Sequence, residues 1–417
     1  MEKKTAILVG LVLILVGSSV STFDYKLRNN SSMEKSATLA QMVYHDPIII
    51  MNNSDFLTQK VANGWPGTGE WDSPILISDY IIEFSHEAIT IMNVDLYFYI
   101  GNCQTLDYFF PYWGSTGIKL VNCSNGVIQM SVADMKDTGI LIQNCTSIEV
   151  NSTTVHDCFT GIKILDSKNI EILENNLGWN DWVGVNSTMN DLCVIAHNSI
   201  LEVPDYAIIS LYDNQTYIEG NTITSTYLGD PQFSNIGVYT LASNDTELVS
   251  NYIANCESGI EMIMANNPRI SDCTVSNTIE YGIYLGEGSS GATIEENYLG
   301  PTEGSNAYDS GDGNSWDNPV SLIGNYWSDY EGSGWYYIPG SAGSIDHYPM
   351  IYTPPTITTT TTTGSTTTTT PTTSPTIIGD PFSNTLIASI IIGGSGLIMV
   401  VAVILIIRDR RGLAGLG

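Results

Sequence analysis

The sequence predicts an all-β protein whose main body is a single-stranded right-handed parallel β-helix of about ten coils, followed by one C-terminal transmembrane helix. Three observations predict this architecture: a Gly-aliphatic step that recurs about every 22 residues, a second recurring column that ends in Asn, and one long uncharged apolar run near the C-terminus. Charged residues make up only 14% of the chain, and Gly, Asn, Ser, Thr, Ile and Tyr are frequent, which disfavours exposed helices.

The first column sets the coil length. A Gly or Ala followed by Ile or Val recurs at intervals of 22, 22, 23, 23, 30, 22 and 23 residues. The steps are Gly117-Ile118, Gly139-Ile140, Gly161-Ile162, Gly184-Val185, Ala207-Ile208, Gly237-Val238, Gly259-Ile260 and Gly282-Ile283. After each step the residues alternate, as with Ile118 and Leu120 against Lys119, and a period of two predicts a strand.

The second column predicts a ladder of Asn side chains at a turn. An aliphatic residue is followed three positions later by Asn, and Asn bonds readily to its own turn backbone. The predicted ladder members are Asn151, Asn175, Asn198, Asn221, Asn251 and Asn297. This role is structural. Strands on successive coils lie about 4.8 Å apart, so the rod should be about 45 to 50 Å long.

The two ends of the chain carry targeting signals. Met1–Lys4 is basic, Thr5–Gly17 is apolar, and small residues follow, which is typical of a secretory signal. The uncharged run of 24 residues at 384–407 is long enough to cross a bilayer. Arg408, Arg410 and Arg411 follow it and indicate a cytoplasmic tail, with the bulk of the chain outside the cell. A retained N-terminal anchor is the alternative.

The predicted organisation follows from these features. Fifteen Thr in the twenty-one residues from Thr356 to Thr376 indicate an extended stalk, and nine Asn-x-Ser/Thr sequons suit an extracellular glycoprotein. The predicted segments are a signal peptide at 1–22, a linker at 23–47, an N-terminal cap at 48–71, β-helix repeats at 72–300, a C-terminal cap at 301–352, the Thr-rich stalk at 353–383, the transmembrane helix at 384–407 and the cytoplasmic tail at 408–417.

Charge excludes one class of partner. The formal net charge is -30, and from Asn169 to Asp380 there are 26 acidic residues against one basic residue, Arg269. Such a surface repels phosphate backbones, so we expect no nucleic-acid binding. It attracts cations. The scarcity of Arg and Lys also disfavours binding or cleavage of acidic sugars.

The segments at the two ends of the repeats resemble those of a known family. The entry runs from Ile48 to Gly69, and the exit contains Gly324-Asn325-Tyr326-Trp327-Ser328-Asp329-Tyr330 and Asp346-His347-Tyr348-Pro349. With the two columns, they resemble NosD-like proteins and the wider carbohydrate-binding and sugar-hydrolysis β-helices, especially archaeal surface proteins. The resemblance covers Ile48 to about Tyr352 and implies the fold; for activity it is weak.

One corner of the coil holds the candidate catalytic residues. The turn before the Gly column supplies Asp134, His156, Asp157 and Asp181 from three consecutive coils. Asp134 and His156 both lie five residues before their column Gly, so we expect them to be neighbours. Carboxylates one or two coils apart have separations of about 5 or 10 Å, which bracket those of glycosidases. A solvated acidic face without catalysis is the competing interpretation.

Candidate binding residues lie on this corner and in one insertion. Trp179 and Trp182 could stack on sugar rings beside the carboxylates. The thirty-residue interval contains an inserted loop with Tyr227 and Phe233, and such loops line grooves or simply extend the surface.

Metal binding has two weaker candidates. Asp309, Asp312 and Asp317 lie on a Gly-rich turn and offer oxygen ligands for calcium, although an ordinary Asp/Gly turn explains them as well. Copper maturation, which the NosD-like resemblance implies, would need soft ligands, and Cys256, Met262 and Met264 are the nearest grouping. Seven cysteines leave at least one unpaired; Cys123 and Cys145 lie close enough to bond, but stacked free thiols are preferred.

Three functions from different classes follow. The first is a membrane-anchored extracellular rod that binds glycans or surface proteins, the second is a glycoside-active enzyme, and the third is a copper-site maturation factor. We favour the first function, because it accounts for the rod, the stalk and the anchor and does not require a set of catalytic residues.

Overall fold

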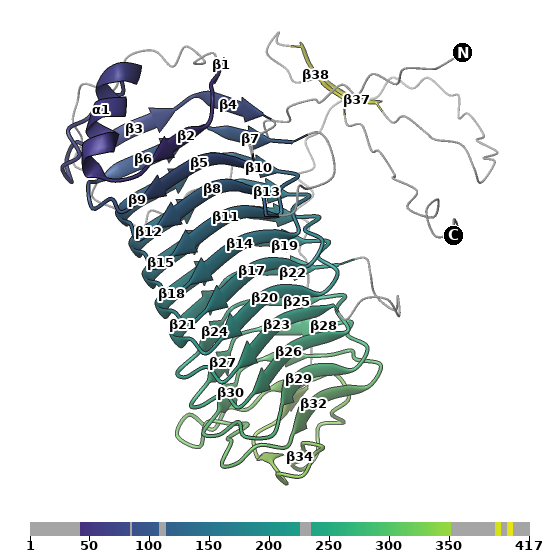
Figure 1. Cartoon of the computed structure of the whole chain (residues 1–417). Helices are drawn as coiled ribbons and strands as arrows, with labels where there is room; N and C mark the ends of the chain where they lie inside the picture. Colours follow the sequence, from purple (N-terminus) through teal and green to yellow (C-terminus); the bar gives the residue numbers. More distant parts are fainter. Residues whose placement is uncertain are drawn as a thin grey trace, which may run out of the picture. The chain divides into compact units, whose positions relative to one another are not determined.

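The computed structural model describes residues 42–83, 86–107, 114–225 and 235–351, together with two short strands at 388–392 and 398–402. From residue 42 to residue 351 the chain winds into a parallel β-helix with three long sheets (Figure 1). Each full coil passes in order through sheet 1, sheet 2 and sheet 3, and we name the turns between them corner 1-2, corner 2-3 and corner 3-1. The predicted all-β parallel β-helix is confirmed.

The three sheets contain 11, 10 and 13 strands. Sheet 1 consists of β2 (Ile48–Ile50), β5 (Glu87–Met92), β8 (Thr116–Val121), β11 (Thr138–Gln143), β14 (Thr160–Leu165), β17 (Val183–Thr188), β20 (Tyr206–Leu211), β23 (Ile236–Leu241), β26 (Ser258–Ile263), β29 (Tyr281–Leu285) and β32 (Ser305–Asp309). Sheet 2 consists of β3 (Ile75–Ser78), β6 (Phe98–Gly101), β9 (Ser124–Gln129), β12 (Thr146–Asn151), β15 (Lys168–Leu173), β18 (Asp191–Ala196), β21 (Asn214–Glu219), β24 (Glu247–Val249), β27 (Arg269–Ser271) and β30 (Thr293–Glu295). Sheet 3 consists of β1 (Val43–Tyr44), β4 (Tyr80–Glu83), β7 (Gln104–Leu106), β10 (Val132–Asp134), β13 (Thr154–His156), β16 (Asn176–Gly178), β19 (Ser199–Leu201), β22 (Thr222–Thr224), β25 (Tyr252–Ala254), β28 (Thr274–Ser276), β31 (Tyr298–Leu299), β33 (Tyr326–Trp327) and β36 (Met350–Ile351).

The Gly column sets the register of sheet 1 as the sequence predicts. Ile118 pairs with Ile140, and Ile140 pairs with Ile162. All three side chains are fully buried in the core. The Gly before each Ile has little room beside it, because a Cβ on Gly161 would lie 2.4 Å from the carbonyl oxygen of Gly184 in the next coil. The small residue therefore allows close coil-to-coil contact at corner 3-1.

The Asn ladder runs along corner 2-3 inside the rod. The backbone N–H of each member donates to the side-chain oxygen of the member in the next coil. The successive bonds are Thr153 to Asn175 at 2.9 Å, Asn175 to Asn198 at 2.9 Å, Asn198 to Asn221 at 2.9 Å and Asn221 to Asn251 at 3.0 Å. Cys273 replaces Asn in the next coil, and the ladder resumes from Cys273 to Asn297 at 3.0 Å and from Asn297 to Asn325 at 3.1 Å.

The structure corrects one predicted ladder member. Asn151 is the last residue of β12 and pairs with Leu173, not with Asn175. Its side chain is half-buried and bonds to Glu149 and Ser152, and Thr153 occupies the ladder position in that coil. The prediction was two residues out of register because Ile148 and Val150 both suit the aliphatic position of the pattern.

Both ends of the rod are capped. At the N-terminal end, helix α1 (Asn53–Asn63) follows β2 (Figure 1). Its buried Phe56 packs against Trp65 and Phe98. This helix was not predicted from the sequence. At the other end Asp346 terminates the ladder, because its buried carboxylate accepts bonds from the backbone of Asn325 at 2.8 Å and the indole of Trp327 at 2.9 Å.

The paired strands extend past the predicted repeat segment of 72–300 in both directions. β1 and β2 precede it, and β32, β33 and β36 follow it. The Tyr336–Tyr337 strand β34 and the Ile345–Asp346 strand β35 form a separate antiparallel pair near the C-terminal end of the rod.

The C-terminal segment forms a second unit, Thr356–Gly417. Its described residues are β37 (Ala388–Ile392) and β38 (Ile398–Ala402), which pair antiparallel. No helix in the described part of the chain has the length and apolar character to span a membrane. The transmembrane helix at 384–407 thus stays a prediction, and the signal peptide, the stalk and the cytoplasmic tail lie outside the described residues.

The ladder gives a stability prediction. Asn198→Ala removes the acceptor of the Asn175 amide and a donor to the Ile172 carbonyl oxygen at 2.8 Å, and both groups are buried. Since each unsatisfied buried group costs about 1–3 kcal/mol, we expect the free energy of unfolding to fall by about 2–4 kcal/mol in urea titrations. Asn151→Ala is the matched control and should cost less than about 1 kcal/mol. Equal losses would contradict the ladder register described here.

Candidate functional site

Corner 3-1 places the predicted catalytic residues in three successive coils. Asp134 ends β10 and His156 ends β13, and the two residues pair in register. The residue after each strand end has a left-handed backbone: φ is 56° at Met135, 54° at Asp157 and 58° at Trp179. The corner therefore turns sharply at the same position in each coil. The prediction that Asp134 and His156 are neighbours, made from their equal spacing before the column Gly, is confirmed.

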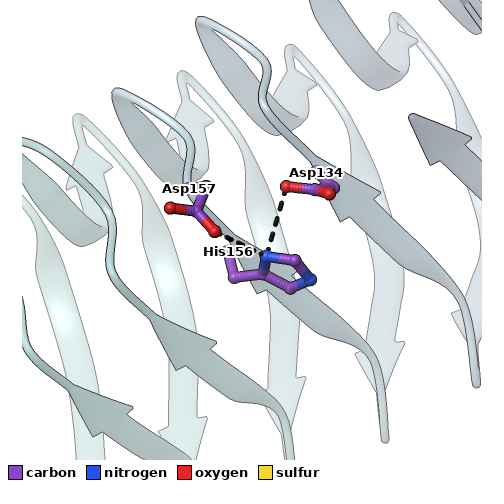
Figure 2. Close-up of side chains that lie close together, drawn as sticks. All are labelled: Asp134, His156 and Asp157. Carbon is purple, nitrogen blue, oxygen red and sulfur yellow. Dashed lines mark hydrogen bonds and ion pairs between the residues drawn. The ribbon is translucent and has the colours of Figure 1, made fainter. Parts of the chain in front are cut away.

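Three of the four predicted catalytic side chains form a cluster. The Nδ1 atom of His156 lies 3.1 Å from Oδ2 of Asp157 and 3.2 Å from Oδ1 of Asp134. Figure 2 shows that Asp157 approaches the ring from the corner that follows His156, whereas Asp134 approaches from the neighbouring strand. The side chains of His156, Asp134 and Asp157 are 33%, 22% and 42% exposed, so solvent reaches the cluster.

The carboxylates change the protonation of His156. Burial disfavours the charged imidazole, but the contacts with Asp134 and Asp157 outweigh it and raise the pKa of His156 to about 10. The ring is therefore protonated at neutral pH and bridges the two carboxylates. In this state His156 cannot act as a general base, because its ring nitrogens already carry their protons.

A buried ion pair lies inside the rod at corner 3-1. Lys136 lies two residues after Asp134, and its Nζ is 2.7 Å from Oδ2 of Asp107, with side chains 0% and 1% exposed. The other carboxylate oxygen of Asp107 has no hydrogen-bond partner among the described residues. The positive charge of Lys136 is thus directed into the rod and away from the open side of the corner.

The other residues predicted for this face do not join the cluster. Asp181 is half-buried at the corner of the next coil, where its backbone N–H donates to Cys158. Trp179 is 56% exposed, whereas Trp182 stacks on Phe159 with ring centroids 5.5 Å apart. One face of Trp182 is therefore covered within the protein. Tyr227 and Phe233 lie outside the described residues.

Two of the three predicted calcium ligands, Asp309 and Asp317, form hydrogen bonds within the C-terminal cap. Asp309 is buried and accepts bonds from four donors: the backbone of Gly311, the Asn314 amide, the Trp316 indole and the Ser344 hydroxyl. Asp317 is also buried and accepts from both the backbone and the ring of His347, at 2.7 Å each. Asp312 is exposed. These three carboxylates do not form a group in the described structure, and calcium binding there stays a prediction.

A tyrosine-lined surface on sheet 1 was not predicted from the sequence. We call it the tyrosine face; it consists of Tyr206, Tyr239, Tyr281, Tyr284 and Tyr308, with Glu261 between them. Tyr239, Glu261, Tyr284 and Tyr308 pair in register on consecutive strands, and all are half-buried. These members share one position, two residues after the Gly column: Tyr239 follows Gly237, and Tyr308 follows Asn306, which takes the column position in the last coil. Lys119 has the same outward-facing position in its own coil, so following that position from coil to coil in the sequence would have identified these residues.

The rings of the tyrosine face lie close together. The ring centroids of Tyr284 and Tyr308 are 5.6 Å apart and stacked, and those of Tyr281 and Tyr284 are 5.1 Å apart. Tyr206 and Tyr239 form a second pair at 5.5 Å. Burial raises the pKa of Glu261, and the carboxylates of Glu280 and Glu257 raise it further. The face therefore combines aromatic rings with carboxyl groups.

Comparison with protein families identifies the relationship that the two columns indicate. The model of the family described as "Periplasmic copper-binding protein (NosD)" matches residues 100–230 and 231–332, which together make up more than half of the chain. The chain belongs to the NosD family. A search of the curated proteins found none that matches.

Solved structures with a similar arrangement include several sugar-active β-helices. The periplasmic alginate epimerase AlgG is 14% identical, with a TM-score of 0.44, 75% of this chain covered and 83% of the other. The Azotobacter vinelandii mannuronan C-5 epimerase AlgE4 A-module is 10% identical, with a TM-score of 0.44 and coverage of 60% and 87%. Pectate lyase Pel9A is 13% identical, with a TM-score of 0.39 and coverage of 66% and 81%.

The copper in the family's description does not fit the soft ligands suggested by the sequence. Cys256 and Met262 are 0% exposed and belong to the core of this NosD-family chain, whereas Met264 is 57% exposed at corner 1-2. All seven cysteines are free and buried. Among the described residues, the nitrogen and oxygen group at corner 3-1 could hold a divalent copper ion, because imidazole and carboxylate suit Cu²⁺.

The buried ion pair under the corner gives a second prediction. Lys136→Met leaves the carboxylate of Asp107 buried without its cation, and breaking such a pair costs about 3–5 kcal/mol. We expect that loss in the free energy of unfolding measured by urea titration. Lys163→Met, on the outer surface of sheet 1, is the control and should change it by less than about 0.5 kcal/mol. Adding Asp107→Leu to Lys136→Met should restore most of the loss; no restoration would contradict this account.

Proposed function

We propose that this NosD-family β-helix is a membrane-anchored extracellular protein that binds glycans on its tyrosine face. The observation that carries the proposal is the row of Tyr239, Glu261, Tyr284 and Tyr308 on consecutive strands of sheet 1. A parallel sheet holds these side chains at a fixed spacing of about 4.8 Å per coil, so the face is preorganised for a linear chain of repeating units.

Tyrosine and glutamate suit the two kinds of surface that a sugar presents. The half-exposed rings offer apolar faces for the C–H groups of a pyranose, and the phenol hydroxyls can donate or accept hydrogen bonds. The carboxylates of Glu261 and Glu257 can accept bonds from sugar hydroxyls. Ordering costs are small, because the tyrosines pack against one another before any ligand binds.

Charge narrows the class of sugar. Within the described residues after position 168, Arg269 is the one basic Lys or Arg side chain, and it lies on sheet 2 with its guanidinium 3.1 Å from Glu295. Glu261 on the tyrosine face lies close to Glu257 and Glu280. A polyuronide would meet these carboxylates without a compensating cation. The proposed ligand is therefore a neutral glycan or one that contains amino sugars.

The proposed location rests on the ends of the sequence and on the family. The family's description names a periplasmic protein, which agrees with a body outside the cytoplasm. The apolar run at 384–407 and the arginines after it support a C-terminal anchor with the β-helix outside. The Thr-rich segment at 353–383 would separate the tyrosine face from the membrane surface.

Glycan binding can be tested on an array with the full chain in a mild detergent. We expect binding to neutral or amino-sugar glycans, and a loss of at least about fivefold in affinity for Tyr284→Ala, since an aromatic contact contributes about 1 kcal/mol. Tyr252→Ala is the matched control, because Tyr252 is 47% exposed on sheet 3, away from the tyrosine face. Binding that is absent, or unchanged in Tyr284→Ala, would overturn the proposal. Shorter glycans after incubation would indicate an enzyme instead.

The anchor has a separate test. A chain that ends at Tyr352 lacks the stalk and the apolar run but retains the described β-helix unit. We expect the full chain to sediment with membranes and the shortened chain to be released into the medium, as measured by immunoblotting of the two fractions. Alkaline carbonate extraction should leave the full chain in the membrane pellet. Membrane retention of the shortened chain would contradict a C-terminal anchor.

A further inference from the structure

We propose that Asp134, His156 and Asp157 form a binding site for one divalent transition-metal ion of borderline softness, such as Zn²⁺, Cu²⁺ or Ni²⁺. Within the described residues they are the group of three in which one ligand atom from each side chain lies within 4.8 Å of the other two. The site is independent of the tyrosine face and of glycan binding.

The distances fit a metal ion as well as they fit a shared proton. Nδ1 of His156 lies 3.1 and 3.2 Å from the two carboxylate oxygens. Ligand atoms bound at about 2.0–2.2 Å are separated by about 3.0 Å at right angles and by about 3.4 Å at tetrahedral angles. Both contacts fall between these values. The distances of both carboxylate oxygens from Nδ1 therefore suit an ion in place of the proton that Nδ1 carries.

The donor types select the class of ion. One imidazole nitrogen with two carboxylate oxygens suits Zn²⁺, Cu²⁺ and Ni²⁺. Ca²⁺ takes six to eight oxygen ligands, which this group does not supply. Monovalent copper prefers thiolates and thioethers, and the cluster contains neither. The two carboxylates balance the charge of a divalent ion.

The open side of the cluster leaves room for water ligands. In the coil after His156 the paired residue is Gly178, and a Cβ added there would meet one atom, the carbonyl oxygen of Leu201 at 3.6 Å. No side chain therefore covers His156 from that position. The exposure of His156, Asp134 and Asp157 also allows an ion to enter from solvent.

One carboxylate oxygen at the site has an ion pair but no well-directed hydrogen bond. Oδ1 of Asp134 is inaccessible to solvent, and its contact with Nδ1 of His156 at 3.2 Å is an ion pair without hydrogen-bond geometry in the described structure. Buried carboxylate oxygens without a well-directed donor are costly. Direct coordination to a cation would satisfy this oxygen better than the ion pair does. The adjacent Lys136 does not compete for it, because its ammonium contacts Asp107 at 2.7 Å.

The test is isothermal titration calorimetry with the full chain in detergent, after treatment with EDTA and dialysis. We expect one site per chain for Zn²⁺ or Cu²⁺ and much weaker binding of Ca²⁺ and Mg²⁺. Asp134→Asn, Asp157→Asn and His156→Ala should each weaken binding about tenfold or more. Electron paramagnetic resonance of bound Cu²⁺ should show a coordinated imidazole nitrogen, and that signal should be lost in His156→Ala.

His347→Ala is the matched control. His347 also contacts a carboxylate through Nδ1, at 2.7 Å from Asp317, but with one carboxylate instead of two. Loss of binding in His347→Ala with full binding in His156→Ala would overturn the assignment, as would no binding by the wild type. Because His156 is partly exposed, its variant should fold, and circular dichroism checks this. The asparagine variants preserve side-chain shape and give the same answer if His156→Ala fails to fold.

Discussion

The backbone amides at the corners are the constraint on which the rod depends. Strands in the three sheets bond to the coils on either side, but a corner residue inside the rod has an N–H group that no strand pairs. At corner 2-3 that N–H group donates to the side-chain oxygen of the ladder residue in the next coil, as Asn198 does to Asn221. Asn suits this position because its side-chain amide also donates to a backbone carbonyl oxygen, as Asn198 does to Ile172. Each link connects two coils, so the ladder also fixes how they stack.

Inside and outside positions of each coil are therefore under different constraints. Inward columns must be aliphatic or must satisfy corner amides, and the Gly column must leave room for the next coil's backbone. Outward columns have no such requirement. In sheet 1 the same outward position holds Lys119 on β8 and Tyr308 on β32, the last strand. Function can consequently vary along the rod while the fold stays the same.

The sequence predicted the inward pattern well, because glycine and alternating isoleucine leave a clear period. The spacing alone could not fix the ladder register, because Val150 is as aliphatic as Ile148. Strand pairing and hydrogen bonding show that Thr153, not Asn151, takes the ladder position. The equal spacing of Asp134 and His156 from their column Gly correctly predicted that the two residues are neighbours. It could not predict that Asp157, with φ of 54°, turns its carboxylate back onto the same ring nitrogen.

The acidic charge of the chain has different consequences at the two candidate sites. At corner 3-1 the carboxylates of Asp134 and Asp157 converge on one imidazole nitrogen, which concentrates negative potential at a point and favours a small cation. On the tyrosine face Glu261 lies between Tyr239 and Tyr284, and burial raises the pKa of its carboxyl group. A carboxyl group held apart between rings can accept hydrogen bonds from sugar hydroxyl groups but does not converge with others on one ion. The arrangement of the carboxylates, and not their number, distinguishes a metal site from a sugar-binding surface.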